Sequence, residues 1–123
     1  MIKNKMEVQT KDSWKVKEFT KSKKFDCNLY LTKEIFEKIS LGHKPREMED
    51  RWFMYCDEFS INFYRSWTGI PIYKAYYEVQ ENYVKILALE INTNPDEYNP
   101  TSINDSIQDF IDMTGAKEHN ENF

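Results

Sequence analysis

The 123-residue chain has little of what marks a secreted, membrane-embedded or metal-binding protein. Its two cysteines, Cys27 and Cys56, form no CxxC pair and are too few for a disulfide framework. Its two histidines, His43 and His119, have no second metal ligand at a recognised spacing, so we interpret them as surface residues. The longest apolar region, residues 84–91, is interrupted by charges and too short to cross a bilayer. We therefore expect a cytoplasmic protein with reduced thiols, no metal, no cofactor and no membrane partner.

The chain also lacks an excess of positive charge. It has 17 Lys and Arg residues and 21 Asp and Glu residues, which gives a formal net charge of -4. Proteins that bind DNA or RNA mainly through phosphates are usually basic, because Lys and Arg displace counterions from the backbone. The composition argues against a DNA or RNA partner. It still allows a small nucleotide bound in a locally positive pocket.

Apolar and aromatic residues are plentiful, at 40% and 15% of the chain, which predicts one folded domain. Residues 1–24 are rich in lysine and form either a solvated arm or a short edge strand around Val16. Residues 25–115 are expected to form a single α+β domain, and residues 116–123 a polar tail.

Two segments have the periodicity of amphipathic helices. Thr32 suits the N-cap of the first and Gly42 its C-terminal end, while Ser102 and Gly115 suit the same positions of the second. The apolar stripes are Ile35, Phe36 and Ile39 in the first helix, and Ile103, Ile107, Phe110 and Ile111 in the second. Each stripe predicts a helix that packs one face against a sheet.

Segments separated by short polar breaks read as strands joined by hairpins. They are residues 25–31, 51–56, 61–67, 72–79 and 83–92. In the third of these segments, alternation places Phe63, Arg65 and Trp67 on one face. The pattern predicts a four- to five-stranded antiparallel meander sheet, flanked by two amphipathic helices that cover one of its faces.

The segment from Arg65 to Gly69 combines side chains that suit a nucleotide. An Arg at a strand end is a forked donor for phosphate or carboxylate, and Trp67 offers a flat face on which a base can stack. Ser66, Thr68 and the Gly69 backbone can add hydrogen-bond donors, and glycine lets the chain approach a ligand closely. These residues are the leading candidates for a binding site.

Two other interpretations involve the same part of the chain. The segment can be a structural turn in which Trp67 packs on the core and Arg65 pairs with Glu49 or Asp50. Alternatively, the two carboxylates could act as acid and base or bind magnesium, although adjacent strand residues point to opposite faces. Solvated charges explain the carboxylates more simply. The sequence has no Gly-rich phosphate loop, GxSxG or HExxH motif, so we assign no catalytic residue.

Two motifs, Met48-Glu49-Asp50-Arg51-Trp52-Phe53 and Phe63-Tyr64-Arg65-Ser66-Trp67-Thr68-Gly69, carry a resemblance to a known family. The region around them, residues 43–92, resembles a small bacterial domain that occurs with ADP-ribose-handling enzymes such as ADP-ribosylglycohydrolases and macrodomain proteins. The resemblance implies a link to nucleotides derived from NAD or ADP-ribose. The positions it indicates are Arg51, Trp52, Arg65, Ser66, Trp67 and Thr68.

Together these features predict a protein that binds or sequesters a nucleotide-derived small molecule without converting it. ADP-ribose, cyclic ADP-ribose and cyclic nucleotides are the expected ligands, and a second subunit could complete the site. By analogy of size and ligand only, the chain could be a phage protein that captures a nucleotide immune signal. The alternatives are an enzyme that hydrolyses an ADP-ribosyl or phosphoester bond, and a protein-interaction domain that uses the Lys-rich arm or a tyrosine face.

Overall fold

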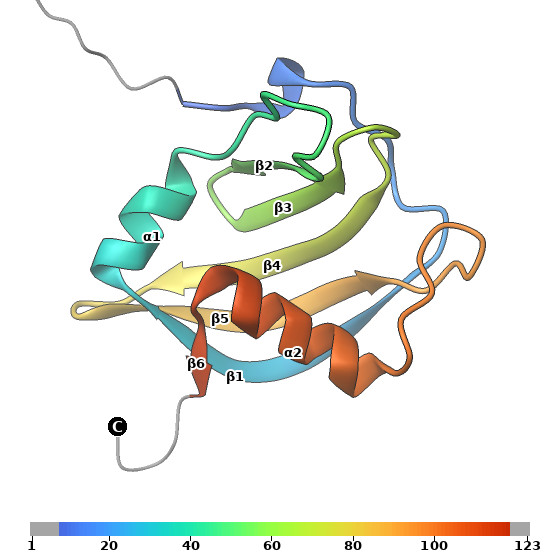
Figure 1. Ribbon diagram of the computed structural model, residues 1–123. Coiled ribbons are helices and arrows are strands. Elements are labelled where there is room, and N and C mark those ends of the chain that lie inside the picture. The colour runs from blue at the N-terminus through green and yellow to red at the C-terminus, as the bar shows by residue number, and fades with distance from the viewer. Residues whose placement is uncertain (1–7, 119–123) are drawn as a thin grey trace, which may run out of the picture.

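The computed structural model describes residues 8–118, which form one antiparallel sheet and two helices (Figure 1). The strands are β1 (Ser22–Thr32), β2 (Trp52–Cys56), β3 (Ser60–Arg65), β4 (Pro71–Val79), β5 (Tyr83–Asn92) and β6 (Lys117–Glu118). The helices are α1 (Lys33–Ser40) and α2 (Ile103–Thr114), and a short 3-10 helix, η1, spans Lys11–Ser13. The fold is α+β with an antiparallel sheet, as predicted.

The sheet has six strands in the order β2-β3-β4-β5-β1-β6, which corrects the predicted count of four to five. Strands β2 to β5 follow one another as neighbours, so the predicted meander is present. The additional strand is β6, which pairs with Leu29 and Tyr30 of β1. It has only two residues, too few for an alternating pattern, and it lies where the sequence suggested a polar tail. The rest of that tail, including His119, lies outside the described residues.

Both helices begin and end at the residues that the sequence indicates. The Thr32 hydroxyl accepts a hydrogen bond from the Ile35 N–H at 3.2 Å, and the Ser102 hydroxyl accepts one from the Asp105 N–H at 3.1 Å. Gly115 ends α2 with a φ of 82°, in the left-handed region that favours glycine. These caps satisfy backbone groups at the helix ends and so fix where each helix starts and stops.

The main core lies between the helices and one face of the sheet (Figure 1). Ile39 of α1 and Phe110 of α2 are buried against Phe63, Tyr73 and other inward side chains of the strands. The rings of Phe63 and Phe110 lie 5.6 Å apart, edge to face. Both amphipathic helices therefore contribute to one continuous core, which fixes the position of α2 relative to the end of β3.

The opposite face of β2 and β3 is covered by the segment that precedes β1. Phe53, Tyr55 and Tyr64 form a second buried cluster, on which Trp14 and Val16 pack. The rings of Trp14 and Phe53 stack with their centroids 6.1 Å apart. Val16 lies in no strand, so the structure differs from the predicted edge strand. The described part of the Lys-rich segment is held to the sheet by these aromatic contacts.

Candidate functional site

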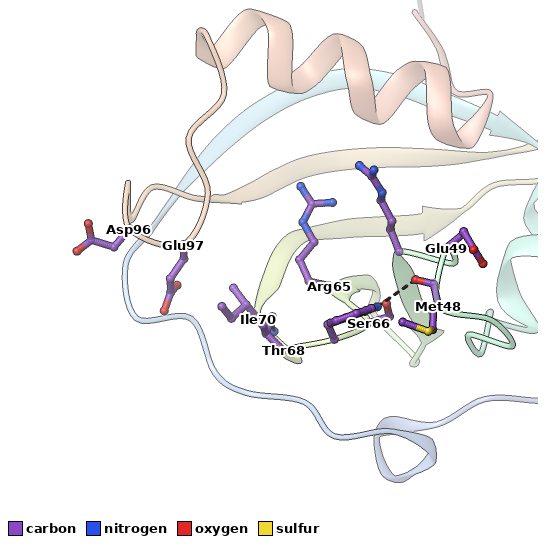
Figure 2. A pocket seen from close by; sticks show the side chains of 10 residues that line it. Met48, Glu49, Arg65, Ser66, Thr68, Ile70, Asp96 and Glu97 are labelled. Atoms are coloured by element: carbon purple, nitrogen blue, oxygen red, sulfur yellow. Dashed lines mark hydrogen bonds between the residues drawn. The ribbon is translucent and has the colours of Figure 1, made fainter.

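A hollow of about 730 Å³ lies at the end of β3, between the turn into β4, the loop before β2 and the loop after β5 (Figure 2). We call it the arginine hollow. Its lining consists of Met48, Glu49, Arg51, Arg65, Ser66, Trp67, Thr68, Ile70, Asp96 and Glu97. Of the seven predicted site residues, five line the hollow, whereas Trp52 and Gly69 do not. Residues from two sequence motifs thus meet at one place.

Arg65 and Trp52 are stacked at the end of the sheet. They are cross-strand partners, and the guanidinium carbon of Arg65 lies 4.6 Å from the centre of a Trp52 ring. The rings of Trp52 and Tyr73 stack with their centroids 6.1 Å apart, so Trp52 packs against the core. The Arg65 guanidinium lies over the Trp52 ring. The indole of Trp52 therefore positions Arg65 and does not line the arginine hollow.

The guanidinium groups of Arg51 and Arg65 have no acidic partner over residues 8–118. Among the described residues, the single ion pair is between His43 and Asp50, so Arg65 pairs with neither Glu49 nor Asp50. Arg65 projects from the end of β3 toward α2 (Figure 2), and Arg51 is exposed. A guanidinium that is half-buried and without a carboxylate partner is a strong binding group for phosphate.

Trp67 forms an exposed wall of the arginine hollow. Alternation along β3 would place it on the face of Phe63, but β3 ends at Arg65 and the chain turns. As a result 62% of the Trp67 surface is exposed, and its indole N–H donates to the Met48 carbonyl at 3.1 Å. The prediction that Trp67 could pack on the core is wrong. The hydrogen bond fixes the indole plane while its surface remains available.

Ser66 and Gly69 build the turn and are not free ligand donors. The Ser66 hydroxyl donates to the Asp50 carbonyl at 2.7 Å, and the Ser66 side chain is almost fully buried. Gly69 has a φ of 76°, and a Cβ at this position would lie 2.5 Å from the Lys15 carbonyl oxygen. Its own carbonyl accepts from the Lys17 N–H at 2.9 Å. Glycine is needed here for the approach of the N-terminal segment.

Thr68 has a different environment from Ser66. Its hydroxyl accepts a hydrogen bond from the Ile70 N–H at 3.2 Å, within the turn, and the residue is exposed. A hydroxyl group that accepts one bond can still donate its own proton. Of the two hydroxyl residues predicted for the site, Thr68 is the one that can reach a ligand from the surface.

The loop between α1 and β2 is organised by Asp50. One carboxylate oxygen lies 2.8 Å from Nε2 of His43, and the other accepts from the Arg46 N–H at 3.3 Å. The hydrogen bond from His43 lowers the pKa of Asp50 below its ordinary value. Asp50 is thus a charged anchor at neutral pH, which does not suit a general acid. Sequence reasoning missed His43, because a His and an Asp seven residues apart in an irregular segment follow no pattern.

Three carboxylates also line the arginine hollow. Glu97 is engaged, since one of its oxygens accepts hydrogen bonds from Thr20 at 3.0 Å and from Asn92 at 2.9 Å. Glu49 and Asp96 are exposed. Carboxylates at nucleotide sites accept hydrogen bonds from ribose hydroxyls, whereas guanidinium groups bind phosphates. A hollow lined by both guanidinium and carboxylate groups suits a ligand that carries phosphates and ribose hydroxyls better than it suits a bare anion.

The two cysteines are poor nucleophiles. Burial raises the pKa of Cys27 to about 11, and burial also raises the pKa of Cys56, so both thiols are protonated at neutral pH. Within residues 8–118, no cluster of three or more His, Cys, Asp or Glu side chains could hold a metal ion. No helix of this described part is long and apolar enough to span a membrane.

Comparison of the chain with protein-family models, with curated proteins and with solved structures gives no match. A functional assignment therefore rests on the geometry of the site.

Proposed function

We propose that this chain is a cytoplasmic protein that binds and sequesters a nucleotide-derived small molecule at the arginine hollow. One observation carries the proposal. The guanidinium groups of Arg51 and Arg65, which have no acidic partner in the described part of the chain, line the same hollow of about 730 Å³ as the exposed indole of Trp67. Ligand sites of this kind usually have volumes of about 300 to 1,000 Å³.

Each group has a distinct part in binding. Arg65, supported by Trp52, and Arg51 bind the phosphates through forked hydrogen bonds. Trp67 stacks on the base, and the Thr68 hydroxyl donates a further hydrogen bond. Exposed carboxylates at the rim accept from ribose hydroxyls. The resemblance of the two motifs to a domain that occurs with ADP-ribose-handling enzymes agrees with this ligand class.

The residues around the hollow favour binding over catalysis. Asp50, the carboxylate nearest to a histidine, is held by hydrogen bonds and has a lowered pKa. The pKa of each cysteine thiol is raised by burial. General acid catalysis needs a carboxyl group whose pKa is raised toward neutrality, and nucleophilic catalysis needs a thiolate. We therefore expect the ligand to be recovered unchanged.

The test is calorimetric titration with ADP-ribose, a cyclic ADP-ribose isomer and cyclic dinucleotides, followed by chromatography of the recovered ligand. Arg65→Ala should weaken binding by about 2 kcal/mol or more, because the forked donor to a phosphate is removed. Arg65→Lys should recover part of this loss, since the charge remains while the fork does not.

Lys33→Ala is the matched control, because it removes one positive charge at the start of α1 and leaves the arginine hollow intact. It should leave the affinity unchanged. Equal affinities of the wild-type protein and Arg65→Ala would remove Arg65 from the site. A chemically altered ligand would show an enzyme, and no binding of any nucleotide would leave a protein-interaction domain as the alternative.

A further inference from the structure

A second hollow, of about 340 Å³, lies between α1, α2 and β2, and we call it the histidine hollow. Its lining consists of Lys38, Ile39, Gly42, His43, Asp50, Trp52, Met54, Phe63, Met113 and Thr114. Five of these ten residues have large apolar or aromatic side chains, while His43 and Asp50 supply a hydrogen-bonded polar pair. An apolar wall with a few placed polar groups is typical of a site for a flat organic ring.

A smaller hollow of about 250 Å³, the connecting hollow, lies between the other two. It shares Arg65 with the arginine hollow, and it shares Trp52 and Met113 with the histidine hollow. The Arg65 guanidinium carbon is 4.6 Å from a Trp52 ring centre and 5.8 Å from that of Tyr98. The three hollows are thus linked by shared lining residues. The middle one is lined by Arg65, which has no ion pair with any described residue, and also by Asp109.

We propose that these hollows form one extended site for a nucleotide with two rings joined through phosphate, a dinucleotide. This inference rests on the proposed function. One base stacks on Trp67, the phosphates lie at Arg65, and the second ring enters the histidine hollow beside Trp52. The spatial order of an exposed indole, a guanidinium with no ion pair to a described residue, and a largely apolar hollow matches the order of base, phosphate and ring in such a ligand.

His43 gives the histidine hollow a specific polar contact. Asp50 holds Nε2 of the imidazole with both carboxylate oxygens, at 2.8 and 2.9 Å. The other ring nitrogen, Nδ1, has no hydrogen bond to the described part of the chain and can meet a polar atom of the second ring. Asp50 orients this histidine and, through its backbone carbonyl, also accepts from Ser66 of the arginine hollow. The two ends of the site are coupled by one residue.

Pairs of ligands that differ in the second ring test the inference. NAD+ is compared with ADP-ribose, and cyclic di-AMP with 3′,5′-cyclic AMP, by calorimetry on the full chain. We expect the two-ring member of at least one pair to bind about tenfold tighter than its one-ring partner, since the second hollow adds buried ring area. Equal affinities within both pairs would overturn the extended site and leave the proposed function standing. Failure of all four ligands to bind would overturn both.

Met113→Trp locates the second ring. Met113 lines the connecting and histidine hollows but not the arginine hollow, and it is 38% exposed, so a larger side chain can be accommodated. The variant should lose the preference for the two-ring ligand and keep wild-type affinity for the one-ring ligand. Met113→Leu, which keeps the volume, should retain the preference. Equal weakening of both ligands by Met113→Trp would contradict the assignment of the second ring to this hollow.

Discussion

The two ends of β3 are both turns, but they are held in different ways. Before β3, one Asp57 carboxylate oxygen accepts from the Phe59 N–H at 2.9 Å and from both the N–H and the hydroxyl of Ser60, at 2.7 and 2.9 Å. All these partners lie within three residues. After β3, Ser66 bonds to Asp50, sixteen residues away, and receives a bond from Trp14, fifty-two residues away. The first turn is held mainly by the Asp57 carboxylate, with two further bonds from Tyr77 of β4, whereas Ser66 in the second is held by two other segments of the chain.

The difference shows how a binding site arises from an ordinary hairpin. A turn that satisfies its own polar groups exposes few groups that a ligand could use. In the turn after β3, distant segments satisfy the buried groups of Ser66 and Gly69, which fixes the backbone. Arg65 can then be held in place without an acidic partner among the described residues, and Trp67 without burial in the core. Rigid support by a second layer of contacts is what a preorganised site requires.

The largest expected effect comes from Gly69→Ala. The substitution forces a Cβ into the left-handed region and against the Lys15 carbonyl, so it should cost about 3 kcal/mol or more of folding free energy. In the turn before β3, Glu58→Ala should change stability by no more than about 0.5 kcal/mol, because Glu58 is exposed. Urea unfolding measures both. Similar losses for the two variants would erase the distinction between the turns.

Two serine substitutions, one in each turn, should have effects of intermediate size and compare the two turns directly. Ser66→Ala leaves the Asp50 carbonyl without its donor, and Ser60→Ala removes hydrogen bonds to Asp57 and from Asn62. Each should cost about 1 to 2 kcal/mol of folding free energy. Only Ser66→Ala should also weaken nucleotide binding, by several-fold, since it loosens a wall of the arginine hollow. Thermal unfolding measures the loss of stability, and calorimetry measures nucleotide binding. Weaker binding by Ser60→Ala would contradict the expected difference between the two turns.

The smallest expected effect is a dependence on acid pH. The hydrogen bond from His43 lowers the pKa of Asp50. For Asp57, burial raises the pKa, but the hydrogen bonds from Phe59 and Ser60 outweigh burial, so the pKa of Asp57 is lowered overall. A carboxylate with a lowered pKa contributes stability above its unfolded pKa and loses it as the pH falls through the folded pKa. The advantage of the wild type over Asp50→Asn or Asp57→Asn should therefore shrink between about pH 5 and pH 2.

Thermal unfolding at a series of pH values measures this advantage. It should be below about 1 kcal/mol for either carboxylate, because Asp57 is exposed and Asp50 is partly exposed. Nucleotide binding separates the two variants, because Asp50→Asn loosens the loop that lines the arginine hollow and Asp57→Asn does not. An advantage that increases toward pH 2 would show that the carboxylates do not stabilise the fold in their charged form.

Much of the fold could be predicted from the sequence, since it depends on contacts between near neighbours. The N-caps Thr32 and Ser102 and the meander from β2 to β5 follow from short-range patterns and are confirmed. The two-residue strand β6 was missed because it has no pattern of its own. The resemblance of the two motifs, rather than residue type, was the reason to expect Arg51 beside residues 65–68, and these residues line one hollow. The structural roles of Ser66 and Gly69 could not be predicted, because the residues that they contact are distant in the sequence.

The sequence by itself determined which segments become helices and strands, because hydrogen bonding along a helix and alternation along a strand are properties of neighbouring residues. It also determined that Arg65 would be at a strand end. Only the tertiary structure decided that Trp52 lies beneath this arginine while Trp67 faces outward, and that His43 meets Asp50. The physical reason is that burial and pairing depend on which segments pack together, and alternation stops predicting direction once a strand ends.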